Sequence, residues 1–260
     1  MTTPWRRNAR AGPPAKRHAT ASPGFEWVWG AHATRAALAN PARGAPERLL
    51  LTPERARELG PLASRLSPTL LGPREITREL PAGAAHQGAA ALLRPLPATP
   101  LETLAAPAQG VLVMLDQLTD PQNVGAIFRT AAAFGARGVI LQDRHAPALG
   151  GALAKAAAGA VDVVPHARVV NLARALENLA DADWRAIGLA AAAPDALADV
   201  LDASPTVLVL GSEGEGLRRL VREHCDALAA IPMAGGFESL NVAAAAAVAL
   251  YEAAHRTPKV

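Results

Sequence analysis

The sequence is poor in cysteine and in aromatic residues. Its 260 residues include one cysteine, Cys225, and aromatic side chains make up 3% of the chain. A single cysteine can neither close an internal disulfide nor supply a cysteine-based metal cluster, which excludes a disulfide-stapled secreted domain and a zinc-cluster protein. We therefore expect a protein of the reducing cytoplasm that binds no metal.

Long apolar runs are also missing. A membrane span needs about 20 apolar residues, and the nearest candidate, residues 242–254, is too short and contains Glu252. Residues 1–24 lack the apolar segment of a secretory signal, and their prolines interrupt the amphipathic helix of a mitochondrial transit peptide. The sequence thus predicts no membrane association and a flexible basic arm over residues 1–24.

The charges are unevenly distributed along the chain. The formal net charge is +3, from 26 basic and 23 acidic residues. Residues 1–25 carry +5, residues 26–98 carry +3 and residues 99–260 carry −5. This distribution favours a front part that meets a polyanion, although an ordinary solvated surface with a basic tail explains it equally well.

The pattern after the arm indicates a small α/β domain over residues 25–95. Helices are predicted over 32–39, 53–66 and from 73 to 78, and strands over 48–52, near 70–71 and over 89–93. Prolines are frequent from residue 95 to 100, which favours an extended chain without backbone donors. We expect residues 96–109 to be a linker between two domains.

Residues 110–260 show a stronger alternation of apolar strands and helices. The predicted strands are 111–115, 138–141, 186–192, 206–210 and 228–231, and the predicted helices are 124–134, 172–179, 217–224 and 240–255. Such alternation is typical of a parallel sheet with helices on both faces. The fold class is therefore α/β in both domains.

Three loops at predicted strand ends are rich in glycine, asparagine and acids, and ligands of open α/β sheets bind at such ends. The first loop, residues 116–125, leads into a helix that carries Arg129. Asn123 is predicted as the N-cap of this helix, which alone can explain it. Arg129 lies six residues further on and is expected to point toward the same end of the sheet. A solvated helix arginine is the alternative.

The second and third loops are Gly211–Gly216 and Ile231–Val242. The second loop contains three glycines but not in the order G-x-G-x-x-G, and its two acids oppose a phosphate. This loop can bind a neutral or cationic ligand, or it can simply form a tight turn between a strand and a helix. In the third loop, Ser239 and Asn241 can cap the final helix or bind a substrate hydroxyl.

Taken together, the three loops resemble the three signature motifs of the SpoU/TrmH group of the SPOUT superfamily, which are RNA ribose 2′-O-methyltransferases. The motifs correspond to Asp116 to Ala131, Gly211 to Gly216 and Ile231 to Val242. WGAHATRAAL and the HQGAA segment resemble the family's L30e-like RNA-binding domain. The chain is most similar to the bacterial members that methylate a guanosine of 23S rRNA in the peptidyl-transferase centre, with GLRRLVREHCD as further support.

The resemblance implies a fold and a cofactor. It implies an L30e-like domain over residues 25–95 and, over residues 110–260, an α/β knot with a parallel sheet and a deep trefoil knot. It also implies that S-adenosylmethionine is held by Gly211, Ile231, Met233 and Leu240. A sulfonium cation agrees with the acids of the second loop.

The resemblance also implies the catalytic residues. Asn123, Arg129, Glu213, Ser239 and Asn241 would bind or activate a ribose 2′-hydroxyl whose oxygen attacks the methyl carbon. Because a guanidinium is nearly always protonated, stabilising the alkoxide or binding a neighbouring phosphate is physically easier for Arg129 than acting as the base. The resemblance does not identify the group that accepts the proton of the 2′-hydroxyl.

The partners implied are 23S rRNA, free or in a pre-ribosomal particle, and a second copy of the chain packed through the final helix. DNA is excluded as a substrate because it has no 2′-hydroxyl. Three alternatives are a tRNA ribose methyltransferase, an inactive ribosome-associated module, and a dinucleotide-dependent enzyme. The substantial front domain argues against a tRNA methyltransferase, and the complete motifs argue against an inactive module. The order of the glycines in the second loop argues against a dinucleotide-dependent enzyme.

Overall fold

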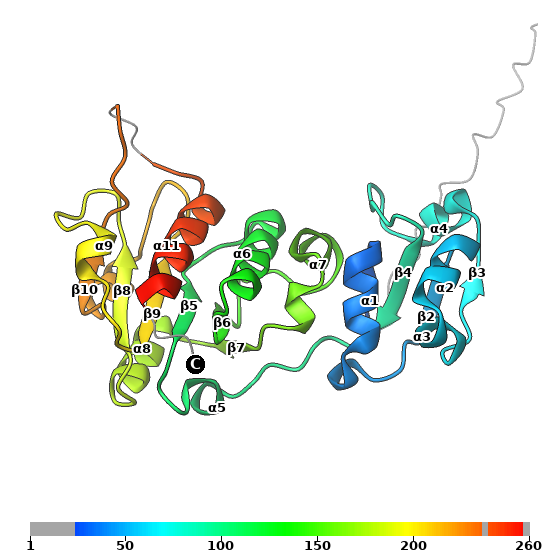
Figure 1. The fold of residues 1–260 in the computed structure, drawn as a ribbon, viewed down its shortest axis with the longest axis horizontal. Helices are drawn as coiled ribbons and strands as arrows, with labels where there is room; N and C mark the ends of the chain where they lie inside the picture. The colour runs from blue at the N-terminus through cyan, green and yellow to red at the C-terminus, as the bar shows by residue number, and fades with distance from the viewer. Residues whose placement is uncertain (1–23, 236–238, 257–260) are drawn as a thin grey trace, which may run out of the picture.

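The structure, a computed structural model, describes residues 24–235 and 239–256. Apart from Gly24, the predicted basic arm lies outside the described residues. The described chain forms two sheets, which lie side by side along the long axis of the molecule (Figure 1). We call residues 24–94 the N-terminal unit and residues 101–256 the C-terminal unit.

The N-terminal unit contains a four-stranded sheet in the order β1-β4-β2-β3. The strands are β1 (Glu26–Trp29), β2 (Arg48–Leu51), β3 (Thr69–Leu70) and β4 (Ala89–Leu93). The helices are α1 (Ala31–Ala39), η1 (Pro41–Arg43), α2 (Pro53–Leu59), α3 (Pro61–Ser64) and α4 (Pro73–Glu79). The predicted helix over 53–66 is divided into α2 and α3 because Gly60 adopts a φ of 54°, which ends α2.

The C-terminal unit contains a six-stranded sheet in the order β10-β8-β9-β5-β6-β7, and every pair in it is parallel. The strands are β5 (Val111–Leu115), β6 (Gly138–Gln142), β7 (His166–Val169), β8 (Arg185–Leu189), β9 (Thr206–Leu210) and β10 (Ala227–Ala229). All residues of β5, β6 and β9 are buried, as a sheet covered on both faces requires. The predicted parallel α/β fold is confirmed.

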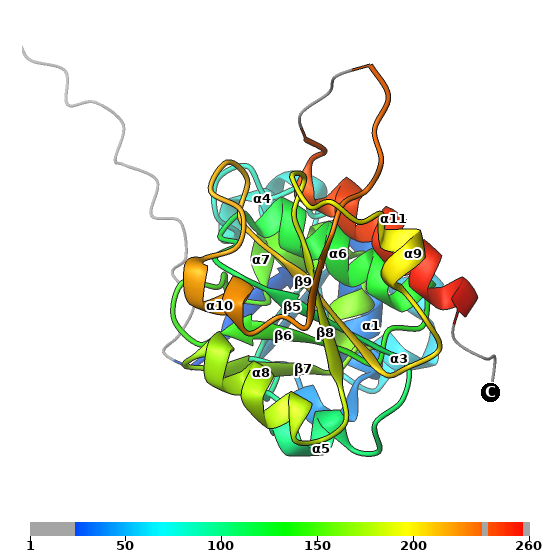
Figure 2. The same cartoon turned by 90° about the vertical axis from the view of Figure 1, so that its left-hand side faces the viewer.

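Helices cover both faces of this sheet (Figure 2). One core cluster joins the sheet to α6 (Pro121–Ala133), α7 (Gly151–Ala157), η2 (Ala160–Asp162), α9 (Leu197–Val200) and α11 (Val242–Arg256). The other joins it to α5 (Leu101–Ala105), α8 (Leu172–Ala180) and α10 (Arg219–Glu223). No helix within the described segments is long and apolar enough to cross a membrane.

The elements that the pattern did not predict are short. α5 lies inside the predicted linker, where Leu104 and Ala105 are buried under the sheet. Its carbonyls accept hydrogen bonds from Arg137 Nε at 2.6 Å and from Trp184 Nε1 at 2.9 Å. A single turn of helix, like the four-residue β7, is too short to show a hydrophobic period, so only tertiary packing reveals it.

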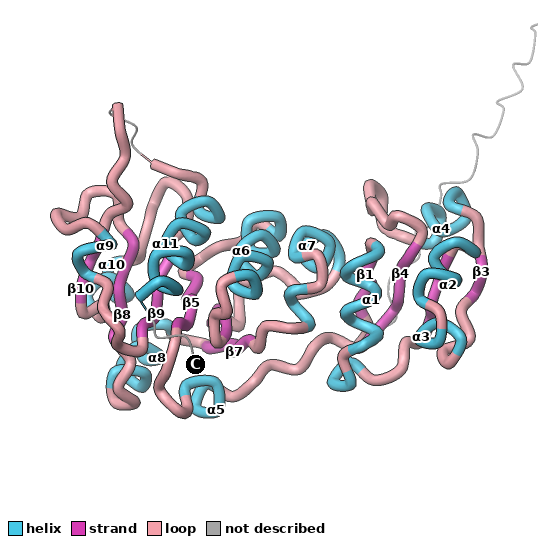
Figure 3. The backbone as a smooth tube through the Cα atoms, viewed as in Figure 1, coloured by secondary structure: helices cyan, strands magenta, loops and turns pink. Residues whose placement is uncertain are grey.

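The two units meet at α7, which packs on α6 on one side and on β1 and α1 on the other (Figure 3). Ala154 of α7 belongs to the hydrophobic core of the N-terminal unit. A Cβ on Gly150 would lie 2.8 Å from the Glu26 side-chain carbon Cδ and 3.0 Å from the Trp27 carbonyl oxygen, so the chain of the N-terminal unit approaches the Gly150 backbone closely here.

A buried ion-pair cluster fastens the same junction. Arg43, whose side chain is 0% exposed, donates from Nη1 to Glu26 Oε1 at 2.7 Å and from Nε to Asp162 Oδ1 at 2.6 Å. Its Nη2 also donates to Asp162 Oδ2 at 3.2 Å, and Asn40 Nδ2 donates to Asp162 Oδ1 at 3.2 Å. Removing one partner from such a buried pair costs about 3–5 kcal/mol. The cluster therefore fixes the N-terminal unit relative to the C-terminal unit.

Candidate functional site

The three predicted loops meet at one edge of the parallel sheet. The first follows β5, the second follows β9 and the third follows β10. β5 and β9 are hydrogen-bonded neighbours, so their carboxyl ends lie together. Residues 236–238 of the third loop lie outside the described residues.

Asp116 links the first loop to the second. Its side chain is fully buried, and its oxygens accept hydrogen bonds from Arg218 N at 2.9 Å and from Arg218 Nε at 2.7 Å. The Asp116 amide also donates to the carbonyl of Leu210, the last residue of β9. Asp116 thus holds the base of the second loop in place, a positioning role that sequence reasoning did not assign to it.

The second loop closes on itself. Ser212 and Gly216 exchange two backbone hydrogen bonds, of 3.2 and 3.0 Å. A Cβ on Gly211 would overlap the Gly216 carbonyl carbon and oxygen and the Leu217 nitrogen, so only glycine fits at position 211. The glycine is therefore required for the loop to close on itself.

The predicted N-cap role of Asn123 is wrong. α6 begins at Pro121 and is capped by Asp120, whose carboxylate accepts from Gln122 N at 3.1 Å and from Asn123 N at 3.4 Å. Proline at the first helical position leaves the preceding residue as the cap. The Asn123 side chain is therefore free to reach the second loop.

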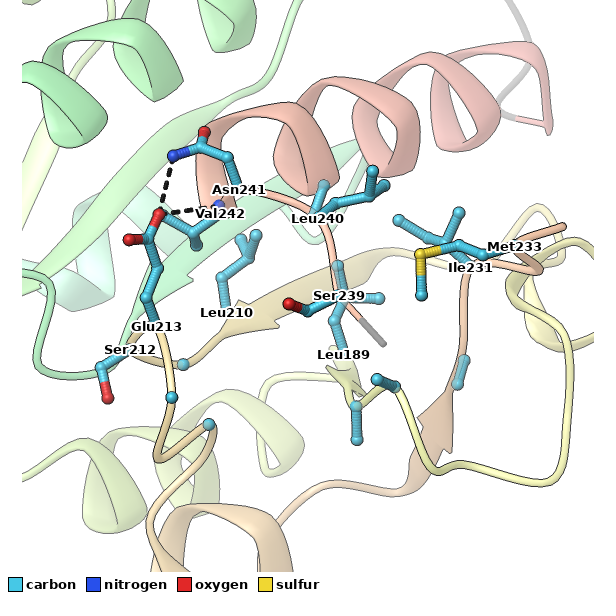
Figure 4. A pocket seen from close by; sticks show the side chains of 17 residues that line it. Leu189, Leu210, Ser212, Glu213, Ile231, Met233, Ser239, Leu240, Asn241 and Val242 are labelled. Atoms are coloured by element: carbon cyan, nitrogen blue, oxygen red, sulfur yellow. Dashed lines mark hydrogen bonds between the residues drawn. The ribbon is translucent and has the colours of Figure 1, made fainter. Parts of the chain in front are cut away.

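Asn123, Glu213 and Asn241, one from each motif, form a hydrogen-bond network. Glu213 Oε1 accepts from Asn123 Nδ2 at 3.2 Å. It also accepts from Asn241 Nδ2 at 2.7 Å and from Val242 N at 3.3 Å (Figure 4). Asn241 Nδ2 lies 3.0 Å from Asn123 Oδ1 as well. These three predicted residues are brought together by the fold.

Asn241 is also the cap of the final helix. Its Oδ1 accepts hydrogen bonds from Ala243 N at 3.0 Å and from Ala244 N at 3.3 Å. These bonds leave its Nδ2 to donate to the network, and they fix the orientation of the amide. The predicted capping role and a role in the site are thus compatible.

Next to the network lies a cavity of about 620 Å³ between the second and third loops and the end of β8. Glu213, Ser239 and Asn241 line it, and so do the four predicted cofactor-binding residues Gly211, Ile231, Met233 and Leu240. The other described lining residues are apolar, glycine or serine: Leu189, Ala190, Ala191, Leu210, Ser212, Gly214, Gly216, Ala229, Val242 and Ala245. Glu213 is therefore the only charged side chain of the lining within the described chain (Figure 4).

Arg129 is not part of this cavity or of the network. It is exposed on α6, and it has no hydrogen-bond or ion-pair partner in the described part of the chain. Six residues along an α-helix correspond to about 9 Å of rise and a rotation of about 240° from Asn123. The arginine consequently projects from a different side of α6 than Asn123 does.

Gly125 has a packing role that the motif alone did not reveal. A Cβ at this position would lie 2.6 Å from both the Cβ of Ala156 and the carbonyl oxygen of Leu153, on α7. The glycine lets α6 and α7 cross closely just after Asn123. This contact connects the N-terminal unit, which packs on α7, to the helix that carries Asn123.

Comparisons with known proteins agree with this arrangement. Residues 110–251 match the model of the SpoU rRNA methylase family. A protein of Mycolicibacterium smegmatis named an uncharacterized tRNA/rRNA methyltransferase is 50% identical over 153 residues, which are 58% of this chain and 48% of that protein. One of the same name from Mycobacterium ulcerans is 41% identical over 216 residues, 82% of this chain and 68% of that protein. The chain spans about half the length of several curated relatives that it matches.

Solved structures resemble both units of the chain. The SpoU methyltransferase AviRb from Streptomyces viridochromogenes, in complex with AdoMet, superposes with a TM-score of 0.73 at 28% identity and covers 89% of this chain and 90% of its own. An AdoMet-bound rRNA methyltransferase from Sinorhizobium meliloti shares the fold, with a TM-score of 0.74 at 24% identity over 91% of this chain and 89% of its own. The chain belongs to the SpoU rRNA methylase family.

Proposed function

We propose that the protein transfers a methyl group from S-adenosylmethionine to the ribose 2′-hydroxyl of a guanosine in 23S rRNA, in the peptidyl-transferase centre. The observation that carries the proposal is the network of Asn123, Glu213 and Asn241 beside a cavity whose described lining residues include no basic side chain. Family membership supports the chemistry, and the resemblance of the motifs supports the nucleotide.

The cavity fits the proposed cofactor. Among the described lining residues there is one carboxylate and otherwise neutral groups, which suits a sulfonium cation and disfavours a polyphosphate. Gly211, Ile231, Met233 and Leu240, which all line the cavity, would hold the cofactor. When bound, S-adenosylmethionine supplies an activated methyl group.

The network residues would bind and orient the ribose. Because all three donors to Glu213 converge on Oε1, Oε2 is left without a partner among the described residues and can accept from the 2′-hydroxyl. Ser239, whose side chain points into the cavity in Figure 4, offers a second hydroxyl contact. Arg129 lies outside the cavity of its own chain; brought to the site by bound RNA or by a second subunit, it would stabilise the developing alkoxide or hold the neighbouring phosphate.

Methylation mapping tests the proposed function. A strain without the gene should lack one ribose methylation in 23S rRNA, and the purified protein should restore it with labelled S-adenosylmethionine. Transfer to tRNA instead would favour the alternative substrate named above. Absence of transfer to any RNA, with the cofactor bound, would contradict the proposal.

We further propose that the protein acts as a homodimer through α11 and the adjoining surface of α6. α11 exposes Ala244, Val248 and Tyr251 at a spacing of one helical face, and Tyr251 packs against Phe134 with ring centroids 5.7 Å apart. Val248 is 44% exposed and Tyr251 is 52% exposed, so the described residues leave about half of each side chain uncovered.

Val248→Asp is expected to convert the dimer to a monomer, because a carboxylate would lose its hydration in the interface. Light scattering on the purified protein measures the mass directly. Leu220→Asp is the matched control, since Leu220 is 51% exposed on α10, which covers the opposite face of the sheet. A wild-type monomer, or a variant dimer, would contradict this expectation.

A further inference from the structure

We propose that the junction of the two units, at Gln87, binds the phosphodiester backbone of the RNA substrate, with Arg55 and Lys155 as the phosphate-binding cations. The proposal rests on the proposed function, because it assigns a place to the same RNA. The family resemblance predicts RNA binding by the N-terminal domain. The present proposal adds Lys155, which lies in α7 of the C-terminal unit, to that RNA-binding surface.

The junction has a fixed geometry. The Arg43 cluster and the packing of Ala154 into the N-terminal core hold α7 against β1. Lys155 lies next to Ala154 in α7, and its side chain crosses Gly30, where an added Cβ would lie 2.6 Å from Lys155 Cδ. Groups of the two units therefore face one another at a constant separation, as a two-sided binding site requires.

The loop that contains Gln87 exposes this residue to solvent and is anchored by its neighbour His86. Gln87 is exposed and adopts a φ of 52°, which is uncommon for a residue with a side chain. Its neighbour His86 is buried and anchors the loop, with Nδ1 accepting from Gly88 N at 3.0 Å and Nε2 lying 3.0 Å from Thr77 Oγ1. Held strain on an exposed polar residue is typical of a binding site.

Two cations from different units converge on Gln87. Arg55 Nε donates to the Gln87 carbonyl oxygen at 2.9 Å, and Lys155 Nζ donates to Gln87 Oε1. Arg55 also pairs with Glu58, whose backbone carbonyl accepts from Arg35. The local balance is thus three cations against one carboxylate.

Lys155 has no carboxylate partner among the residues that the structure describes. Burial lowers the pKa of its ammonium from the ordinary value, because nothing negative offsets the desolvation. A phosphate oxygen would supply the missing charge. The side-chain amide of Gln87 can then bind the adjoining ribose or base edge.

The junction and the cavity lie on the same side of the molecule. The loop before β4, which contains Gln87, is at the upper side of Figure 1, where the third loop also rises from the sheet, and Figure 2 shows the third loop on that side as well. In Figure 1, β6 lies between the cavity strands β8 and β9 and the N-terminal unit, and the loop after β6 exposes Arg144 and His145. RNA held at Gln87 can therefore continue over these residues to the cavity.

Salt-dependent binding tests the proposal. The probe is a 23S rRNA transcript that contains the peptidyl-transferase centre, titrated at several salt concentrations. Each phosphate contact contributes about 0.7–0.9 to the slope of log K against log salt. Lys155→Gln and Arg55→Gln should each reduce the slope by about this amount and weaken binding about three- to tenfold near 0.15 M salt. Arg174→Gln, an equal charge loss on exposed α8, should leave both unchanged.

The outcomes separate the two proposals. Unchanged slopes for Lys155→Gln and Arg55→Gln, in protein that still methylates the transcript, would overturn the junction site alone. A wild-type protein that neither binds nor methylates RNA would overturn both proposals. Cofactor binding equal to that of the wild type shows that the variants are folded, since neither residue lines the cavity.

Site-specific crosslinking gives a second, positive readout. Burial raises the pKa of Cys225, the only native thiol, to about 12, so a thiol-directed aryl azide should react selectively with an introduced cysteine. Gln87→Cys should crosslink to the transcript on illumination, whereas Arg174→Cys should not. Equal crosslinking of both variants would contradict the proposed site.

Discussion

Arg129→Ala is expected to lower kcat for RNA methylation by about 10²- to 10³-fold, the loss typical of removing one donor to a developing oxyanion. The side chain is exposed and unpartnered within the described chain, so the free energy of unfolding should change by no more than about 0.5 kcal/mol. The Kd for S-adenosylmethionine should not change, because Arg129 does not line the cavity. Single-turnover transfer from labelled cofactor measures the rate of methylation, and calorimetry measures the Kd for the cofactor.

Arg129→Lys is the control for charge. Lysine retains the positive charge but loses the planar fork of the guanidinium. If Arg129→Lys recovers part of the methylation rate lost in Arg129→Ala, the role of Arg129 is mainly electrostatic. If it recovers none, Arg129 makes a bidentate contact. Undiminished transfer by Arg129→Ala would remove this residue from the mechanism. The result bears directly on how the site is assembled, because the arginine lies apart from the other polar residues.

Because Arg129 lies apart from the cavity of its own chain, it can act in its own active site or in that of the other subunit of the proposed dimer. α6 packs beside α11, so the proposed dimer surface includes the exposed side of α6. A guanidinium buried there needs an acceptor, which a bound RNA or the other subunit must provide. Mixing Arg129→Ala with Glu213→Gln subunits distinguishes the cases: one intact site forms per mixed dimer if Arg129 acts across the interface, and none forms if it acts within its own chain.

Much of the fold could be predicted because the strands are continuous apolar runs. β5 and β9 have the predicted bounds, because an apolar run of about five residues is too short for a buried helix and favours a buried strand. The cap of α6 was misassigned because aspartate and asparagine are both good caps, although Pro121 already favoured Asp120. The trefoil knot stays a prediction from the family resemblance.

The site was predicted only in its parts. Each of Asn123, Glu213 and Asn241 belongs to a motif that follows a strand, but the bonds that join them at one carboxylate oxygen depend on how three distant motifs pack. The contact between Lys155 and Gln87 could not be predicted at all, because α7 is alanine-rich, short and without a clear polar face. Its register against the N-terminal unit is decided by tertiary packing.

Gly211→Ala is expected to raise the Kd for S-adenosylmethionine by about 100-fold or more, equivalent to about 2.8 kcal/mol. The added methyl would overlap backbone atoms of Gly216 and Leu217, which cannot rotate away as a side chain can. The second loop must therefore move, and a displacement of about 1 Å is enough to cost about 10²-fold in a positioned site. Calorimetric titration with the cofactor measures the change.

Gly214→Ala is the matched control in the same loop. Gly214 lines the same cavity and has a φ of 92°, but an added Cβ meets nothing within 4 Å, so this variant carries backbone strain without a clash. It should lose only the roughly 1–3 kcal/mol of stability that such strain costs, and its cofactor affinity should remain near that of the wild type. Equal losses of affinity in the two variants would mean that loop flexibility, and not the close approach at Gly211, determines cofactor binding. Normal binding by Gly211→Ala would separate the second loop from the cofactor site altogether.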